Sequence, residues 1–207
     1  NQPSTFNAII MDSGGVIQLG TDLTTLDGAM EFNSPTSLTA NAALNSGTGE
    51  INLNDTLDGG GFGLTVQDGL GTGTVTIAGA ISNLGSLTTG AAAYNLLITG
   101  GGTIGGITTF LNTGTLTIGT GGPAPTTTNF TGGLVATAPS GVTLAGTIAT
   151  AGTGTTLGDS NTGVTLGAAT TLNSGTGAIN VNGALNGNNV GLTVQDGLGT
   201  GTVTIAG

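Results

Sequence analysis

Apolar and polar residues alternate with a period of two in short segments along the whole chain. In Thr74–Ile77, two apolar residues, Val75 and Ile77, alternate with two threonines, so the apolar side chains point to one side of an extended backbone. Such alternation with β-branched residues is typical of half-buried strands. The same pattern predicts strands at Ile51–Asn54, Leu64–Gln67, Thr115–Ile118 and Ile179–Asn182.

Glycine separates these predicted strands. The chain contains 43 glycines, and a glycine inside a helix costs about 1 kcal/mol relative to alanine, so helices are not expected. Clusters such as Asp58–Gly61 and Gly100–Gly102 supply the positive φ angles that tight corners need. Gly121–Thr128 contains two prolines, which cannot donate to a sheet ladder, and it is predicted to be a loop that leaves the stack.

A long internal repeat organises the strands. Residues 64–79 return letter for letter as residues 192–207, and over a wider span residues 44–79 match residues 172–207 without insertion, at an offset of 128. A fixed long period is the signature of a repeat architecture. We expect coils of roughly 20 residues, about six in each repeat, with the second copy continuing the first in register.

Two all-β architectures fit short strands with glycine corners, the sandwich or barrel and the β-solenoid. The low aromatic content of 3% and the gapless repeat favour a parallel β-solenoid of short, glycine-cornered coils. We assign residues 36–207 to this solenoid. Residues 1–35 show no match one repeat further on, and we interpret them as a joining or capping segment, with a diverged coil as the alternative.

The composition excludes whole classes of partner. The 207 residues include no lysine, arginine, histidine or cysteine, and ten acidic residues give a formal net charge of −10. Nucleic-acid binding is not expected, because phosphates are bound by lysine and arginine. Membrane insertion is not expected, because no apolar run approaches the roughly 20 residues of a spanning helix. The sequence stops within a repeat, and we interpret it as one window on a longer polymer.

The residue types that most catalytic sites need are absent. Nucleophilic triads use histidine or lysine as a base, and zinc sites are built largely on cysteine and histidine. A two-carboxylate glycosidase built on Asp55 and Asp58 is the remaining enzymatic alternative, but the second copy replaces these residues by Gly183 and Asn186. We therefore predict that the protein is not an enzyme.

Calcium is the one metal whose preferred ligands are plentiful, since it binds carboxylate, amide and backbone carbonyl oxygens. The candidate ligands are Asp55, Asp58, Asp68 and Asp196. Asp68 and Asp196 each precede a glycine, a pattern that is typical of a plain turn. We predict no cofactor and keep calcium as the alternative.

Surface threonines suggest a further alternative. Thr-x-Thr triplets occur at residues 74–76, 115–117 and 202–204, and a flat stacked array of threonines would match the lattice of ice. The preference of threonine for exposed strand positions explains the triplets equally well. Asn54–Thr56 and Asn129–Thr131 match the glycan acceptor pattern, which is expected by chance in a chain so rich in asparagine and threonine.

Three phrases carry a family resemblance: Thr56–Gly61, Thr74–Ile81 and Thr170–Gly175. They resemble the β-strand repeats of filamentous-haemagglutinin-like and autotransporter-type bacterial surface proteins. The resemblance extends over nearly the whole chain and is mostly compositional. It implies a right-handed β-helix, secretion, and an adhesive or fibre-forming function.

Repetition builds length and surface, which a single active site does not need. We predict a structural subunit or segment of an extracellular or cell-surface bacterial filament, whose main partner is itself in a head-to-tail homopolymer made by stacking of coils. The first alternative is the stalk of a giant single-chain adhesin, with surface glycans as partners. The second is an ice-binding or glycan-active β-helix.

Overall fold

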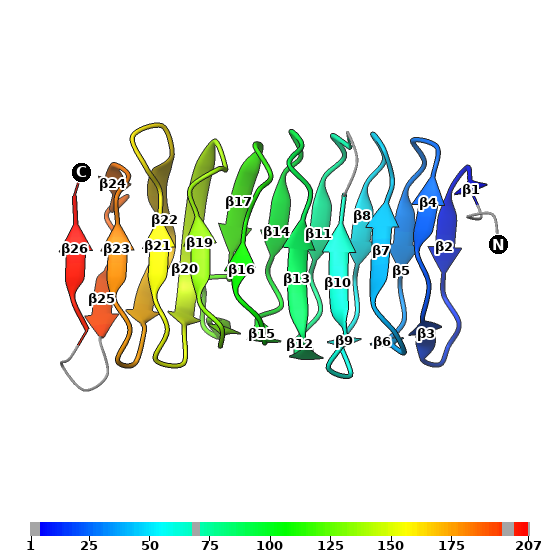
Figure 1. Cartoon of the computed structure of the whole chain (residues 1–207), viewed down its shortest axis with the longest axis horizontal. Coiled ribbons are helices and arrows are strands. Elements are labelled where there is room, and N and C mark those ends of the chain that lie inside the picture. Colours follow the sequence, from blue (N-terminus) through cyan, green and yellow to red (C-terminus); the bar gives the residue numbers. More distant parts are fainter. Residues whose placement is uncertain (1–4, 68–70, 196–200, 207) are drawn as a thin grey trace.

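The computed structural model describes residues 5–67, 71–195 and 201–206, and every regular element in these ranges is a β-strand. All strand pairs are parallel, and along most of the chain a strand pairs with the strands three positions before and after it. The chain winds as a β-solenoid of about nine turns (Figure 1). The predicted all-β, parallel solenoid class is confirmed.

Three faces run along this rod. The first face carries β1 (Thr5–Phe6), β4 (Leu23–Thr25), β7 (Ala42–Asn45), β10 (Gly63–Val66), β13 (Ser86–Thr89), β16 (Thr108–Thr109), β19 (Leu134–Ala136), β21 (Thr155–Leu157), β23 (Ile179–Val181) and β26 (Val203–Ile205). It consists of two five-stranded sheets that meet where β13 contacts β16.

The second and third faces belong to one continuous sheet, because β20 (Gly141–Ala149) and β22 (Gly163–Asn173) each pass from one face to the other. Besides the first parts of these two strands, the second face carries β2 (Ile9–Met11), β5 (Met30–Phe32), β8 (Ile51–Leu53), β11 (Val75–Ile77), β14 (Leu96–Ile98), β17 (Thr115–Ile118) and β24 (Leu185–Asn186). Besides their second parts, the third face carries β3 (Ile17–Leu19), β6 (Thr36–Leu38), β9 (Leu57–Asp58), β12 (Ile81–Leu84), β15 (Gly102–Ile104), β18 (Thr127–Phe130) and β25 (Leu192–Gln195).

The coils differ in length although their strands stay in register. The register partner of Ile17 is Thr36, whereas that of Thr108 is Leu134, so the second of these coils is the longer one. The extra residues lie in corners rather than in strands, as in the exposed segment of residues 121–125 between β17 and β18. The predicted loop is therefore confirmed except at its end, since Thr127 and Thr128 already belong to β18.

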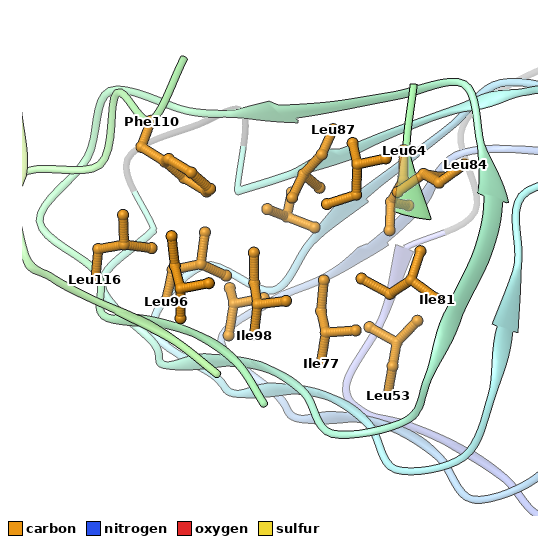
Figure 2. Packing of buried hydrophobic residues seen from close by; sticks show 14 of the residues in the cluster. Leu53, Leu64, Ile77, Ile81, Leu84, Leu87, Leu96, Ile98, Phe110 and Leu116 are labelled. Atoms are coloured by element: carbon orange, nitrogen blue, oxygen red, sulfur yellow. The ribbon is translucent and has the colours of Figure 1, made fainter. Parts of the chain in front are cut away.

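The core is a narrow column of aliphatic side chains along the axis of the rod. Ile77 lies between its register partners Leu53 and Ile98, and all three side chains are fully buried. Figure 2 shows these residues pointing into one interior from successive coils. Aromatic packing is local, with the rings of Phe110 and Phe130 edge to face at a centroid distance of 6.0 Å. Because the inward residues of each strand are covered by those of the next coil, burial depends on continued stacking.

The corners are so close together that side chains are excluded from some of them. A Cβ atom placed on Gly73 would lie 1.5 Å from the backbone oxygen of Gly49 in the preceding coil. No rotamer change relieves an overlap between a Cβ atom and a backbone atom. Glycine is therefore required at residue 73 by close approach of two backbones.

The described part of residues 1–35 forms β1 to β5 and pairs with later strands of the same stack; β2, for example, pairs with β5 in parallel register. Inward residues Ile9 and Ile17 belong to the same hydrophobic cluster as the rest of the rod. Whether this segment joins or caps the solenoid stays a prediction.

The identical Val-Thr-Ile triplets of β11 and β26 allow a matched test of burial. Ile77 is fully buried, whereas Ile205 is 49% exposed. Ile77→Ala is expected to lower the free energy of unfolding by about 2–5 kcal/mol. Ile205→Ala, in the same local sequence, is expected to lower it by about 1 kcal/mol. Urea denaturation of the two variants measures the difference, and equal losses would contradict burial by the following coil.

A second matched pair tests the corner contact. Gly73→Ala places a methyl group against the Gly49 carbonyl and is expected to destabilise the rod by about 3 kcal/mol or more. Gly187→Ala has no atom within 4 Å of the new Cβ and is expected to change stability by less than about 1 kcal/mol. Thermal unfolding followed by circular dichroism distinguishes them; a Gly73→Ala protein as stable as the parent would contradict the close backbone approach.

Candidate functional site

The four aspartates predicted as calcium ligands do not form a described site. Asp55 follows β8, and its Oδ1 accepts a hydrogen bond of 2.6 Å from the N–H of Thr56. Asp58 is exposed in β9, and its Oδ1 accepts bonds from the Gly60 N–H at 3.1 Å and the Asn83 Nδ2 at 3.4 Å. Asp68 and Asp196 lie outside the described residues. Within the described ranges, no three acidic, histidine or cysteine side chains come together as a metal site.

A polar network on the second face was not predicted. Asn52 Nδ2 donates to Glu31 Oε1 at 2.8 Å and to Glu50 Oε2 at 3.3 Å, and Asn54 Nδ2 donates to Asn33 Oδ1 at 2.7 Å and to Glu31 Oε2 at 3.2 Å. The spacing of 21 residues between Asn33 and Asn54 was the signal available in the sequence, since it equals one coil. Three of these four bonds join neighbouring coils, so the network is a structural clamp on the outside of the rod.

The surface threonines form single rows. On the second face Thr117, Thr143 and Thr165 are register partners on three consecutive coils, but Thr115 is followed in its row by glycines at 141 and 163. The Thr-x-Thr pattern of β17 is therefore not continued by the next two coils. On the third face, four threonines lie in one row over consecutive coils, namely Thr127, Thr147, Thr171 and Thr193. Neither face carries a double row of threonines over these coils.

Tyr94 is a buried polar residue in the apolar core. Its side chain is fully buried, and its hydroxyl donates a hydrogen bond of 3.3 Å to the backbone carbonyl of Val66. Burial raises the pKa of Tyr94 from its ordinary value of 10.0 to about 12, against the smaller lowering effects of the Thr89 side chain and the Gly90 backbone. The raised pKa shows that the folded core disfavours the phenolate.

The two sequence copies build the same corner at different places around the rod. In the first copy the corner follows β7 of the first face: Asn45 Oδ1 accepts from the Gly47 N–H at 3.2 Å, the hydroxyl of Ser46 donates to the Gly49 carbonyl, and Gly47 has a φ of 60°. In the second copy the corner follows β22 on the third face. It repeats all three features at Asn173, Ser174, Gly175 and Gly177, with a φ of 62° at Gly175.

The whole second copy is displaced in the same way. Strands β8 and β11 of the second face correspond in sequence to β23 and β26 of the first face, and β10 of the first face corresponds to β25 of the third. Numbering coils from their first-face strand, β7 belongs to the third coil and its counterpart in β22 to the eighth. The repeat thus advances by five coils and two strands. This is close to the predicted six coils, but one repeat does not fill a whole number of coils.

The Val-Thr-Ile triplet of β26 has different surroundings from its identical copy in β11. In β11, Val75 and Ile77 are fully buried between β8 and β14. The same triplet in β26 pairs with β23 on one side only, and Val203 and Ile205 are 43% and 49% exposed. Among the described residues no strand lies on the other side of β26. An unpaired strand edge with exposed apolar residues favours the addition of a further strand.

No family model, no curated protein and no solved structure matches the chain. None of the described elements is a helix that would be long and apolar enough to span a membrane.

The raised pKa of Tyr94 predicts a specific alkaline behaviour. The chain has one tyrosine and no lysine, arginine or cysteine, so Tyr94 is the only side chain that titrates between about pH 9 and 12. Because its folded pKa of about 12 exceeds the unfolded value, its contribution to stability is complete below pH 10 and is lost as the pH rises towards 12.

Urea denaturation at increasing pH measures this loss, and tyrosinate absorbance of the folded protein gives the pKa. Tyr94→Phe is the matched control, and its stability is expected to stay constant over the same range. Tyrosinate formation in the folded protein with a midpoint at the ordinary value would contradict the burial of the hydroxyl.

Proposed function

We propose that the protein is a structural β-solenoid segment of an extracellular bacterial filament, in which coils stack end to end. The observation that carries the proposal is the Val-Thr-Ile triplet that β11 and β26 share. In β11 this triplet accepts β14 as its neighbour and is fully buried. A coil of the same kind therefore fits against β26.

Stacking supplies two kinds of interaction at once. A coil added to β24, β25 and β26 pairs with backbone N–H and C=O groups of parallel strands, and it covers the exposed apolar side chains of Val203 and Ile205. Both interactions are those already made between every pair of neighbouring coils in the rod. Assembly by stacking therefore needs no interface other than the one that already joins neighbouring coils within the rod.

The charge of the chain also supports an extended assembly. With ten acidic residues and no basic side chain, the flanks of neighbouring rods repel one another at low salt. The ends are less affected, because backbone pairing and apolar burial dominate there. End-to-end growth is therefore favoured over side-by-side clumping, and screening by salt is expected to reduce the difference.

A stalk within a giant single-chain adhesin is the second candidate. The observation that favours it is that two copies of one sequence already stack in a single chain, β8 to β11 and β23 to β26. In that case the coil that covers β26 belongs to the same polypeptide. Both candidates use the same stacking surface and differ only in the origin of the next coil.

Assembly can be tested with a charge placed inside or outside the stacking surface. We expect the protein to form rods that lengthen with concentration, as seen by sedimentation velocity and electron microscopy. Val203→Asp buries a carboxylate at the joint and is expected to weaken association at least about tenfold. Thr204→Asp adds the same charge to the outward side of the same strand and is expected to leave association within about twofold.

Circular dichroism establishes that both variants fold. Monodisperse monomers of the parent protein at high concentration would contradict assembly from separate chains and favour the single-chain stalk. Equal weakening by both aspartates would show that charge alone, rather than the stacking surface, controls association.

A further inference from the structure

Equivalent strands of the two copies lie on different faces of the rod, and they are displaced by a fixed number of strand positions. Counting β20 and β22 as two strands each, one repeat spans seventeen strand positions, from β7 to the second part of β22. Seventeen is not a multiple of three, so a strand that lies on one face in the first copy lies on the preceding face in the second. Thr76 is thus on the second face and Thr204 on the first.

We infer that every further copy of the repeat is turned by one face, so that the surface of the repeat is presented on all three faces in turn. The inference rests on the proposed function, because it concerns an array longer than two copies.

The faces are interchangeable because the local structure is set by local sequence. The Asn-Ser-Gly-Thr-Gly corner forms the same hydrogen bonds after a first-face strand and after a third-face strand. Likewise, the Ile-Asn-Val strand β23 on the first face has the same alternation of buried and half-buried residues as Ile-Asn-Leu in β8 on the second. Nothing in these segments selects a particular face.

The next coil fits the edge strand by strand. In the first copy, β12, β13 and β14 cover β9, β10 and β11, and their register pairs include Leu57 with Ile81, Leu64 with Leu87 and Val75 with Leu96. The covered residues have identical counterparts on the edge: Leu185 in β24, Leu192 in β25 and Val203 in β26. A coil with the sequence of residues 80–98 therefore fits on this edge. Each of its strands would lie on the face that precedes the one it occupies in the first copy.

Three copies restore the original orientation. Three times seventeen strand positions make seventeen coils, and at about 4.8 Å per coil the axial period is about 82 Å. A partner that recognises the outward side chains of β11 then meets them on one face only once in each period. Around the rod it meets them in three directions.

The test uses a chain extended by two further copies of residues 80–207, with Thr76→Cys, Thr204→Cys and the two equivalent substitutions. The chain has no cysteine, so maleimide-coupled gold clusters mark these positions alone. In electron micrographs we expect successive clusters to project from three sides in turn, about 27 Å apart along the axis, and the first and fourth to share a side about 82 Å apart. Clusters that all project from one side would overturn the inference.

The 207-residue chain provides the matched control and a test that does not depend on folding of the extended array. Thr76→Cys with Thr165→Cys places both labels on the second face, whereas Thr76→Cys with Thr204→Cys places them on different faces. If the second pair projects from one side like the first, the inference is wrong. The extended array is a single chain, so this result is separate from any failure of the parent protein to assemble.

Discussion

The parallel backbone ladder between consecutive coils is the constraint on which the rest of the structure depends. Hydrogen bonding between parallel strands fixes the separation of neighbouring coils at about 4.8 Å. At that separation Gly73 passes the Gly49 carbonyl too closely for any Cβ atom. The same spacing stacks Ile77 between Leu53 and Ile98, and all three side chains are fully buried. The glycine at such a corner and the stacking of the core residues both follow from this spacing.

Much of the fold could be predicted from the sequence because the determinants are local. Val75 and Ile77 point inward as their alternation indicates, and the proline-containing segment after residue 120 leaves the stack. The position of each strand around the rod could not be predicted, because it depends on how many strands precede it. The sequence does not reveal how many strands precede a given one, because corners vary in length while short and long coils keep their strands in register equally well. The hydrogen bond between Glu31 and Asn52 could not be predicted without the coil length, because that length determines which residues of neighbouring coils lie side by side.

The candidate aspartates show where sequence reasoning about function stops. Asp55 and Asp58 are close in sequence and typical of metal or acid–base chemistry, yet the bonds that they accept are those of turns and of a neighbouring asparagine. The feature that supports a function was instead hidden in the repeat. The proposal of stacking starts from the triplet that β11 and β26 share, which is fully buried between two neighbouring strands in β11.

The corner at Asn45–Gly49 has a counterpart on another face, and this bears on how such a chain lengthens in evolution. Since the corner forms equally well after strands of two different faces, a gene duplication does not need to contain whole coils to give a folded product. It needs only to begin and end at equivalent points of a strand-and-corner unit. A duplication whose length is not a whole number of coils, like the one in this chain, changes which side of the rod the older surface residues occupy relative to the new ones.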